Sequence, residues 1–399
     1  MHMRENPSEE FLLYLLTSFT CVSLLLICYE TNSVSSEKSR NFYLAFAETN
    51  NNIGFDQTAN ISSSNITIAN RTSLDDVEAL YNKGYIVSNL GRYEEAISYY
   101  DKVLAIDPHH IDALYFKGLA LSDLGRYEEA ISYYDKVLAL KPESLRGLAS
   151  KGNALSELGL YEDAVAYYDK ALAVDPSAIG VVHNKAFALF NLGRYEKALN
   201  NYDKVLAVEK NNLDAMNDKG NIFLRLQRYQ EALDYFDKIL ALEPSNVDVI
   251  YNKGLTLSSL GRYQEALDNY DKALAIDSNY IKALNNKGYI LFNLGRYQEA
   301  LDYFDKILAL EPSNVDALNN KGYILFNLGR YQEALDNYDK ALAIDPNYIK
   351  ALNNKGYILF NLGRYQEAIT FSDKILAINA HYRPAMDLKK MALGAMDNQ

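Results

Sequence analysis

Cysteine, tryptophan and basic clusters are scarce or missing in this sequence of 399 residues. It has two cysteines and no tryptophan, and its formal net charge is −12. Both cysteines, Cys21 and Cys28, lie in one apolar stretch, so the rest of the chain has neither a disulfide framework nor a cysteine-ligated zinc site. The negative charge and the lack of a basic stripe argue against nucleic acid as a partner.

Residue constellations for catalysis are missing as well. The five histidines are scattered, and the adjacent pair His109 and His110 has no helical i,i+4 partner that would suggest a metal site. No glycine-rich phosphate loop followed by Lys-Ser or Lys-Thr occurs. We therefore predict a protein that is not an enzyme, with no catalytic residue, no metal, no cofactor and no small-molecule substrate.

The longest apolar run covers residues 11–29 and carries no charge. About twenty apolar residues span the hydrocarbon core of a bilayer, so the run predicts an uncleaved membrane anchor behind a short tail, residues 1–10. A cleaved secretory signal is the first alternative, although the nearest small-x-small pattern, Ala45-Phe46-Ala47, lies far downstream. A buried core helix is the second alternative.

Residues 30–76 lead from this run into the rest of the chain. Much of the segment is rich in Asn, Ser and Thr without an amphipathic period, which predicts a disordered, flexible stalk. Three N-x-Ser/Thr sequons at Asn60, Asn65 and Asn70 would be glycosylated only if the stalk is exported. Since the basic residues flanking the apolar run are nearly balanced, the sequons favour a membrane-anchored chain with its body outside the cytoplasm. The alternative is secretion after signal cleavage.

The remainder of the chain is one unit repeated every 34 residues. A glycine followed two residues later by tyrosine marks each unit, and Gln227 fills the one vacant glycine position. Nine units follow without insertion, and residues 383–399 remain as a capping helix. The units are residues 77–110, 111–144, 145–178, 179–212, 213–246, 247–280, 281–314, 315–348 and 349–382.

Each unit has the apolar periodicity of two amphipathic helices. In residues 281–314 the pattern predicts helices from Ile281 to Leu294 and from Tyr297 to Leu310, joined by a Gly-Arg turn. Proline ends six of the units because it cannot continue the preceding helix. Lys210, Ser278 and Ala380 take its place in the others, where we expect less sharply defined junctions. The recurrent Asp-Lys dipeptide of the second helix is interpreted as solvated surface.

Small residues recur inside both helices. A mid-helix glycine costs about 1 kcal/mol relative to alanine, so its recurrence in the first helix predicts a close approach between helices. The second helix has alanine at a fixed position and an aromatic ring four residues later in eight units. Ser372 replaces the ring in the ninth unit, where we expect the core to fray.

Glycine or alanine, tyrosine, alanine, aromatic ring and proline at these offsets resemble the tetratricopeptide repeat family over residues 77–382. Apolar residues such as Leu284 stand where the family often has tryptophan. The resemblance implies an all-α fold, a right-handed superhelical α-solenoid of helix-turn-helix repeats. Here it would follow an N-terminal hydrophobic helix and a disordered stalk. The first helices would line a concave groove.

Family analogy places positions 2, 5, 6, 9, 12 and 13 of each unit on this groove, and position 6 is asparagine in six units. An amide offers both a donor and an acceptor to a peptide backbone, and tyrosine is favoured at interfaces. A merely solvated helix face is the alternative interpretation. The predicted partner-binding residues are Asn252, Asn285, Asn286, Tyr289, Asn319, Asn320, Tyr323, Asn353, Asn354 and Tyr357.

These features predict a non-catalytic scaffold for protein–protein interaction. Its partners would be extended peptide segments of other proteins, and residues 11–29 would tether it to a membrane. Since tyrosine-rich surfaces also stack on sugars, the alternative is an extracellular structural protein that binds glycans or the cell envelope.

External protease treatment of intact cells tests the predicted topology. If the repeats lie outside the cytoplasm, added protease will digest them while a cytoplasmic marker protein stays intact. Digestion of the repeats only after lysis would contradict this placement. Recovery of the repeats from the medium would instead indicate a cleaved signal.

Overall fold

The computed structural model of the chain describes residues 67–397, and every regular element in this part is a helix. These helices belong to two compact units, which are described separately because the boundary between Asn201 and Tyr202 falls within one helix, α10. For these residues, the two helices per repeat predicted from the periodicity and the all-α fold implied by the family resemblance are confirmed. The right-handed superhelix stays a prediction.

The helices alternate between the first and second helix of each repeat. The two helices of residues 281–314 begin and end within one residue of the predicted positions. The first helices are α3 (Thr67–Asn89), α5 (Ile111–Asp123), α7 (Leu145–Glu157), α9 (Ile179–Asn191), α11 (Leu213–Arg225), α13 (Val247–Ser259), α15 (Ile281–Asn293), α17 (Val315–Asn327) and α19 (Ile349–Asn361). The second helices are α4 (Tyr93–Ile106), α6 (Tyr127–Leu140), α8 (Tyr161–Val174), α10 (Tyr195–Val208), α12 (Tyr229–Leu242), α14 (Tyr263–Ile276), α16 (Tyr297–Leu310), α18 (Tyr331–Ile344) and α20 (Tyr365–Ile378), followed by α21 (Arg383–Asp397).

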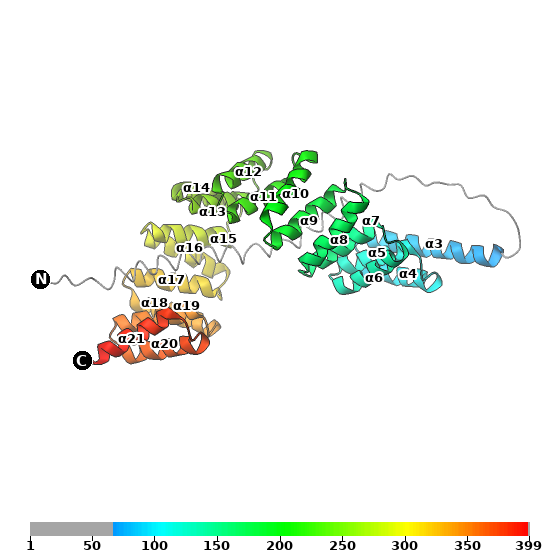
Figure 1. Cartoon of the computed structure of the whole chain (residues 1–399). Coiled ribbons are helices and arrows are strands. Elements are labelled where there is room, and N and C mark those ends of the chain that lie inside the picture. The colour runs from blue at the N-terminus through cyan, green and yellow to red at the C-terminus, as the bar shows by residue number, and fades with distance from the viewer. Residues whose placement is uncertain (1–66, 398–399) are drawn as a thin grey trace. The chain divides into compact units, whose positions relative to one another are not determined.

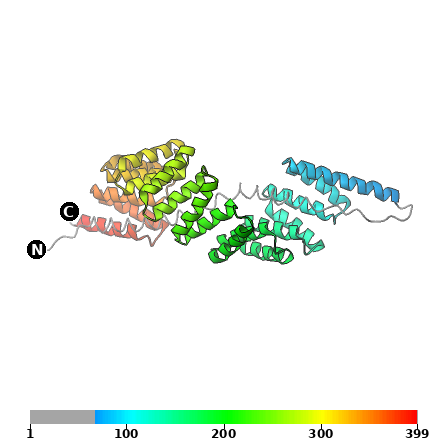
Figure 2. The same ribbon diagram turned by 90° about the horizontal axis from the view of Figure 1, so that it is seen from above.

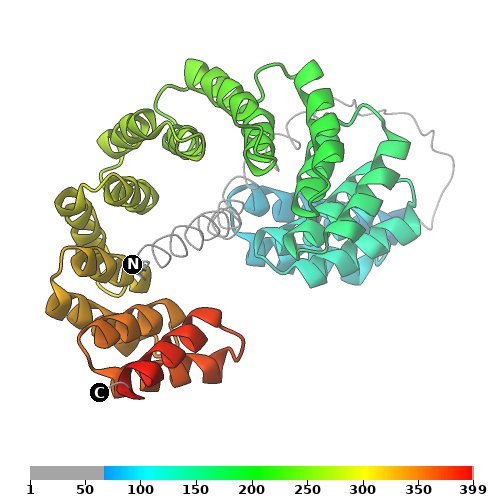
Figure 3. The same ribbon diagram turned by 60° about the vertical axis from the view of Figure 1, so that its left-hand side comes forward.

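Within each unit, helices that follow one another in the chain pack together, as α16 packs on α15 and on α17, so consecutive hairpins of one unit are neighbours in space. Figure 1 shows this order in the second unit from α11 to α21, and Figure 2 shows it for the hairpins of the first unit. In Figure 3 the hairpins of the second unit follow one another around an arc. Some first helices also contact the next first helix, as α17 contacts α19.

The turn inside each hairpin is closed by a left-handed residue. Gly295 has φ 75°, and the N–H of Arg296 donates to the carbonyl of Leu291 at 2.9 Å, the Schellman arrangement. The same turn occurs at Gln227, which is forced to φ 58°. The glycine-to-glutamine exchange seen in the sequence therefore introduces a strained residue without changing the turn.

The turn between hairpins does not depend on proline, so the prediction of less sharp junctions at Lys210, Ser278 and Ala380 is wrong. Helices α14 and α15 are separated by the same four residues as hairpins joined through proline. The Asp277 carboxylate accepts the N–H of Asn279 at 2.9 Å, as Asp345 does for Asn347 beside a proline. This side-chain cap closes the turn in either case.

Rings of the second helices explain the mid-helix glycines. A Cβ built on Gly322 would lie 2.7 Å from Cε1 of Tyr338, and the Tyr338 ring is fully buried. The close approach predicted from the glycine is therefore made by the ring rather than by the alanine four residues earlier.

The ninth hairpin keeps a closed core, so the fraying expected at Ser372 is wrong. Ser372 is completely buried, and its hydroxyl donates to the carbonyl of Ala368 at 3.0 Å. Leu388 of α21 is also completely buried and would lie 2.9 Å from a Cβ on Gly356. The leucine of α21 thus fills the space that a ring fills in the other hairpins, as a capping helix should.

An ion pair joins each hairpin to the next, so the Asp-Lys dipeptide, which was interpreted as mostly solvated surface, also has a structural role. Its aspartate pairs with a first-helix lysine sixteen residues later. Burial alone would lower the pKa of Lys219, but hydrogen bonds to Asp203 and Tyr235 outweigh this effect and raise the pKa. The pairs among the described residues are Lys117–Asp101, Lys151–Asp135, Lys185–Asp169, Lys219–Asp203, Lys253–Asp237, Lys287–Asp271, Lys321–Asp305, Lys355–Asp339 and Lys389–Asp373.

The amino-terminal predictions fall mostly outside the described residues. The apolar run of residues 11–29 and the sequons at Asn60 and Asn65 lie there, while Asn70 lies in α3. Because α3 begins at Thr67, the predicted flexible stalk is wrong for residues 67–76, where the helix of the first repeat extends towards the amino terminus at little cost. Within residues 67–397 no helix is both long and apolar enough to cross a membrane.

Replacing Gln227 with glycine should stabilise the protein by about 1 kcal/mol, because a left-handed backbone costs a residue with a side chain about that much. Urea unfolding of the wild type and of Gln227→Gly measures the difference. The reverse exchange, Gly295→Gln, is the matched control and should destabilise by a similar amount. An unchanged midpoint in both variants would contradict the strain.

Replacing Tyr270 with phenylalanine should stabilise the protein by about 1 kcal/mol at pH 7. The Tyr270 hydroxyl is buried and has no hydrogen-bond partner within residues 67–397, and burial of such a group is unfavourable. Tyr168→Phe is the matched control, because the Tyr168 hydroxyl donates to Asn153 Oδ1 at 2.8 Å and its loss should destabilise. Urea unfolding at pH 7 measures both changes.

The same two variants test an alkaline effect. Burial raises the pKa of Tyr270 and of Tyr168. The unfolded chain therefore releases these protons first, so stability present below about pH 10 is lost as the pH rises further. Each phenylalanine variant should show a smaller loss between pH 9 and about pH 11. An identical loss in wild type and variants would refute this origin.

Candidate functional site

Three consecutive first helices carry the same set of side chains on one face. On α15 the set is Asn286, Tyr289, Phe292 and Asn293, spaced so that all four share one side of the helix. The first three are half-buried and the last is exposed. We name this surface of α15, α17 and α19 the amide–aromatic strip. It consists of Asn286, Tyr289, Phe292, Asn293, Asn320, Tyr323, Phe326, Asn327, Asn354, Tyr357, Phe360 and Asn361.

The asparagines at position 5 point into the stack of helices. Asn319 is 3% exposed and Asn353 is 6% exposed, whereas Asn285 is half-buried. Two of the predicted partner-binding residues therefore have little surface for a partner. The position-6 residues Asn286 and Asn320 keep more of their surface.

Amide groups link neighbouring first helices through hydrogen bonds. Asn354 Nδ2 donates to Asn319 Oδ1 at 3.1 Å, and Asn286 Nδ2 donates to the Tyr251 hydroxyl at 2.7 Å. Asn252 Nδ2 likewise approaches an asparagine oxygen of α11 at 3.3 Å. Since a primary amide has two N–H donors and two acceptor lone pairs, these single bonds hold the position-6 amides in place and leave capacity for a ligand.

The amide ladder ends at α21. At the place where the next hairpin would supply an asparagine, α21 has Leu388, which fills the core instead. The Asn353 Oδ1 atom is therefore buried with no hydrogen-bond partner among the described residues. The last complete rung of the ladder is the pair Asn319 and Asn354.

Aromatic rings extend the strip beyond the residues predicted to bind. The rings of Phe292 and Tyr323 lie 5.3 Å apart between centroids, so they connect two hairpins. Phe292 also lies 5.4 Å from the ring of Tyr297. Burial raises the pKa of Tyr289 and Tyr323, so both phenols stay neutral to a higher pH than an exposed tyrosine does. The phenylalanines were missed as binding candidates, although they recur with the same 34-residue period.

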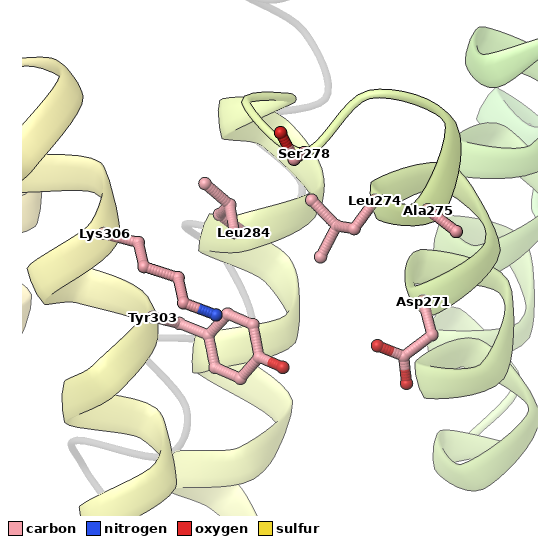
Figure 4. Close-up of a pocket in the computed structure, with 7 residues that line it drawn as sticks. All are labelled: Asp271, Leu274, Ala275, Ser278, Leu284, Tyr303 and Lys306. Carbon is pink, nitrogen blue, oxygen red and sulfur yellow. The ribbon is translucent and has the colours of Figure 1, made fainter.

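A cleft of about 290 Å³ lies between α14 and α16. Figure 4 shows Tyr303 and Lys306 of α16 across from Asp271 of α14, with Leu284 between them. Lys287 pairs with Asp271 and lies 4.9 Å from the Tyr303 ring centroid, so much of the polar chemistry here serves the contact between hairpins. Among the described residues, no group of three His, Cys, Asp or Glu side chains could hold a metal ion.

Comparison with protein families finds one kind of repeat along most of the chain. A search of curated protein sequences finds no match. Models described as tetratricopeptide repeat match residues 75–143, 115–179, 184–247, 245–310, 285–349 and 337–370.

Among solved structures, one gives the same fold. A tetratricopeptide repeat protein from Parabacteroides merdae is 20% identical, with a TM-score of 0.51, and the alignment covers 62% of this chain and 98% of that one. Yeast Tom70 is 16% identical, with a TM-score of 0.42, and the alignment covers 81% of this chain and 96% of Tom70. YrrB, described as a tetratricopeptide repeat protein with an unusual peptide-binding site, is 27% identical, covering 56% and 97%, with a TM-score of 0.33.

Proposed function

Because the chain belongs to the tetratricopeptide repeat family, we propose that it is a non-catalytic scaffold. It binds extended segments of partner proteins along the amide–aromatic strip. The observation that carries this proposal is the repetition of one uncharged set of amides and rings on α15, α17 and α19. A merely solvated helix face would more often carry glutamate and lysine than rings and amides.

The chemistry of the strip suits a peptide backbone. Each position-6 amide is held by a neighbour, as Asn354 is by Asn319, so little side-chain entropy is lost when it binds a ligand. The amides supply donors and acceptors, and the half-buried rings supply area at low entropic cost. This division of roles supports binding of an extended chain in preference to a compact small molecule.

Membrane tethering is the second part of the proposal. Residues 11–29 form the anchor, and the repeats lie outside the cytoplasm where the sequons at Asn60, Asn65 and Asn70 can be used. The length of the apolar run and the spacing of the sequons support this arrangement. A tether concentrates the scaffold, and therefore its partners, at one surface.

Replacing Asn286, Asn320 and Asn354 together with alanine should weaken partner capture. Each lost amide bond is worth about 1 kcal/mol, so the triple variant should bind roughly a hundredfold more weakly. A pull-down with the full-length chain measures the loss, and circular dichroism checks the fold. The matched control replaces the exposed asparagines Asn211, Asn279 and Asn347, which lie in turns between hairpins.

Unchanged capture by a folded triple variant would remove the strip as the binding surface. Binding on a glycan array that is lost in the same variant would favour the glycan-binding alternative. Capture of a protein partner, lost with the strip asparagines and kept in the control, is the result expected.

A further inference from the structure

The three identical faces of the amide–aromatic strip restrict what can occupy it. A ligand that meets the same side chains on α15, α17 and α19 must present the same chemistry at each step, or two of the three faces would be wasted. Helices in contact lie about 8–10 Å apart. Helix α17 contacts α19, and the rings of Phe292 and Tyr323 join α15 to α17. The ligand should therefore repeat about every 8–10 Å.

Two extended conformations can be compared with this step. A polyproline II helix has three residues per turn and rises about 3.1 Å per residue, so one turn advances about 9 Å. A β-strand returns to the same side after two residues, or about 7 Å. Only the polyproline II period matches the step, so one turn of such a segment would face each hairpin.

The side chains of the strip also match this conformation. Polyproline II has no internal hydrogen bonds, so its carbonyls are free to accept, and proline has no N–H to donate. Asn286 and Asn320 offer amide N–H donors. Phe292 and Tyr323, with centroids 5.3 Å apart, continue the aromatic surface from one hairpin to the next. Aromatic-lined surfaces bind proline-rich segments because the ligand is already ordered.

The charges on and beside the strip indicate what charge its ligand can carry. The strip contains no charged residue, although the whole chain has a formal net charge of −12. Beside the strip, the Asp316 carboxylate accepts a hydrogen bond from the Tyr348 hydroxyl and lies 3.3 Å from Lys350 Nζ. These two charges are thus paired with each other, and the side chains of the strip itself offer a charged ligand no ion-pair partner in return for its lost hydration.

We propose that the amide–aromatic strip binds an uncharged, proline-rich protein segment in the polyproline II conformation, one turn per hairpin. This inference rests on the proposed function and names its class of partner. Tyr289, Tyr323 and Tyr357 receive equivalent residues three apart in the ligand. The strip is used fully by about nine ligand residues, three for each hairpin.

Fluorescence anisotropy with the full-length chain in detergent tests the ligand class. The probe is labelled dodecaproline, compared with labelled (Gly-Ser)6 and with (Pro-Pro-Glu)4. Dodecaproline should bind at least about tenfold more tightly than either. In a series of hexaproline, nonaproline and dodecaproline, affinity should rise from the first to the second, which adds one turn, and then level off. Equal binding of the flexible or acidic peptide, or no binding of dodecaproline, would overturn the inference.

Variants locate the binding. The triple change Tyr289→Ala, Tyr323→Ala and Tyr357→Ala should weaken dodecaproline binding at least about tenfold, since each ring contributes area at the contact. The triple change to phenylalanine keeps the ring faces and should lose no more than about threefold. Tyr99→Ala, on α4 in the first unit, is the control and should have no effect. Unchanged binding by the folded alanine variant would place the peptide elsewhere and refute the inference.

The two proposals fail in different ways. If dodecaproline does not bind, but the variant lacking Asn286, Asn320 and Asn354 still loses its captured partner, the scaffold function stands and the polyproline II ligand is wrong. If that variant captures its partner normally and dodecaproline does not bind, both proposals are wrong.

Discussion

Packing of a second-helix ring against a glycine of its own first helix is the contact on which most of the hairpins depend. At Gly322 an added Cβ would lie 2.7 Å from the Tyr338 ring. A mid-helix glycine destabilises the helix by about 1 kcal/mol relative to alanine. Burial of the apolar surface of a whole ring stabilises the hairpin by more than that. The ring can lie against the backbone only where no side chain intervenes, so this contact sets how close the two helices come.

Polar contacts then set how one hairpin follows another. A partly buried lysine pairs with an aspartate of the preceding second helix, and amides such as Asn354 and Asn319 join neighbouring first helices. Helix α21 shows which of these contacts a cap keeps. It retains the ion pair of Lys389 with Asp373 but replaces the ladder asparagine with Leu388, which closes the core over Gly356.

The amide–aromatic strip follows from duplication within this architecture. Residues 285–302 and 319–336 are identical. Because each repeat contacts only its neighbours, a duplicated hairpin finds the same surroundings and presents the same face. A surface that arises by copying is periodic, and periodicity is itself a form of specificity, since it favours partners whose own conformation repeats at the same distance.

The sequence by itself determined the helices, their pairing and part of the strip, namely its position-6 asparagines and its tyrosines. These follow from local spacing: a 34-residue period, glycine where a left-handed turn is needed, and apolar residues at helical intervals. Inference from the sequence missed the contacts that join one hairpin to the next. The Asp-Lys dipeptide looked like solvated surface because its lysine partner lies sixteen residues away on another helix.

Only the tertiary structure decided how each of these residues is used. Asn319 and Asn320 are adjacent and chemically identical, yet one is buried in the ladder and the other keeps part of its surface. The sequence predicted that the core frays at Ser372, but Leu388 of α21 packs against Gly356 and closes it. In each case the outcome depends on which neighbour fills the adjacent space, and that depends on packing between helices rather than on spacing along the chain.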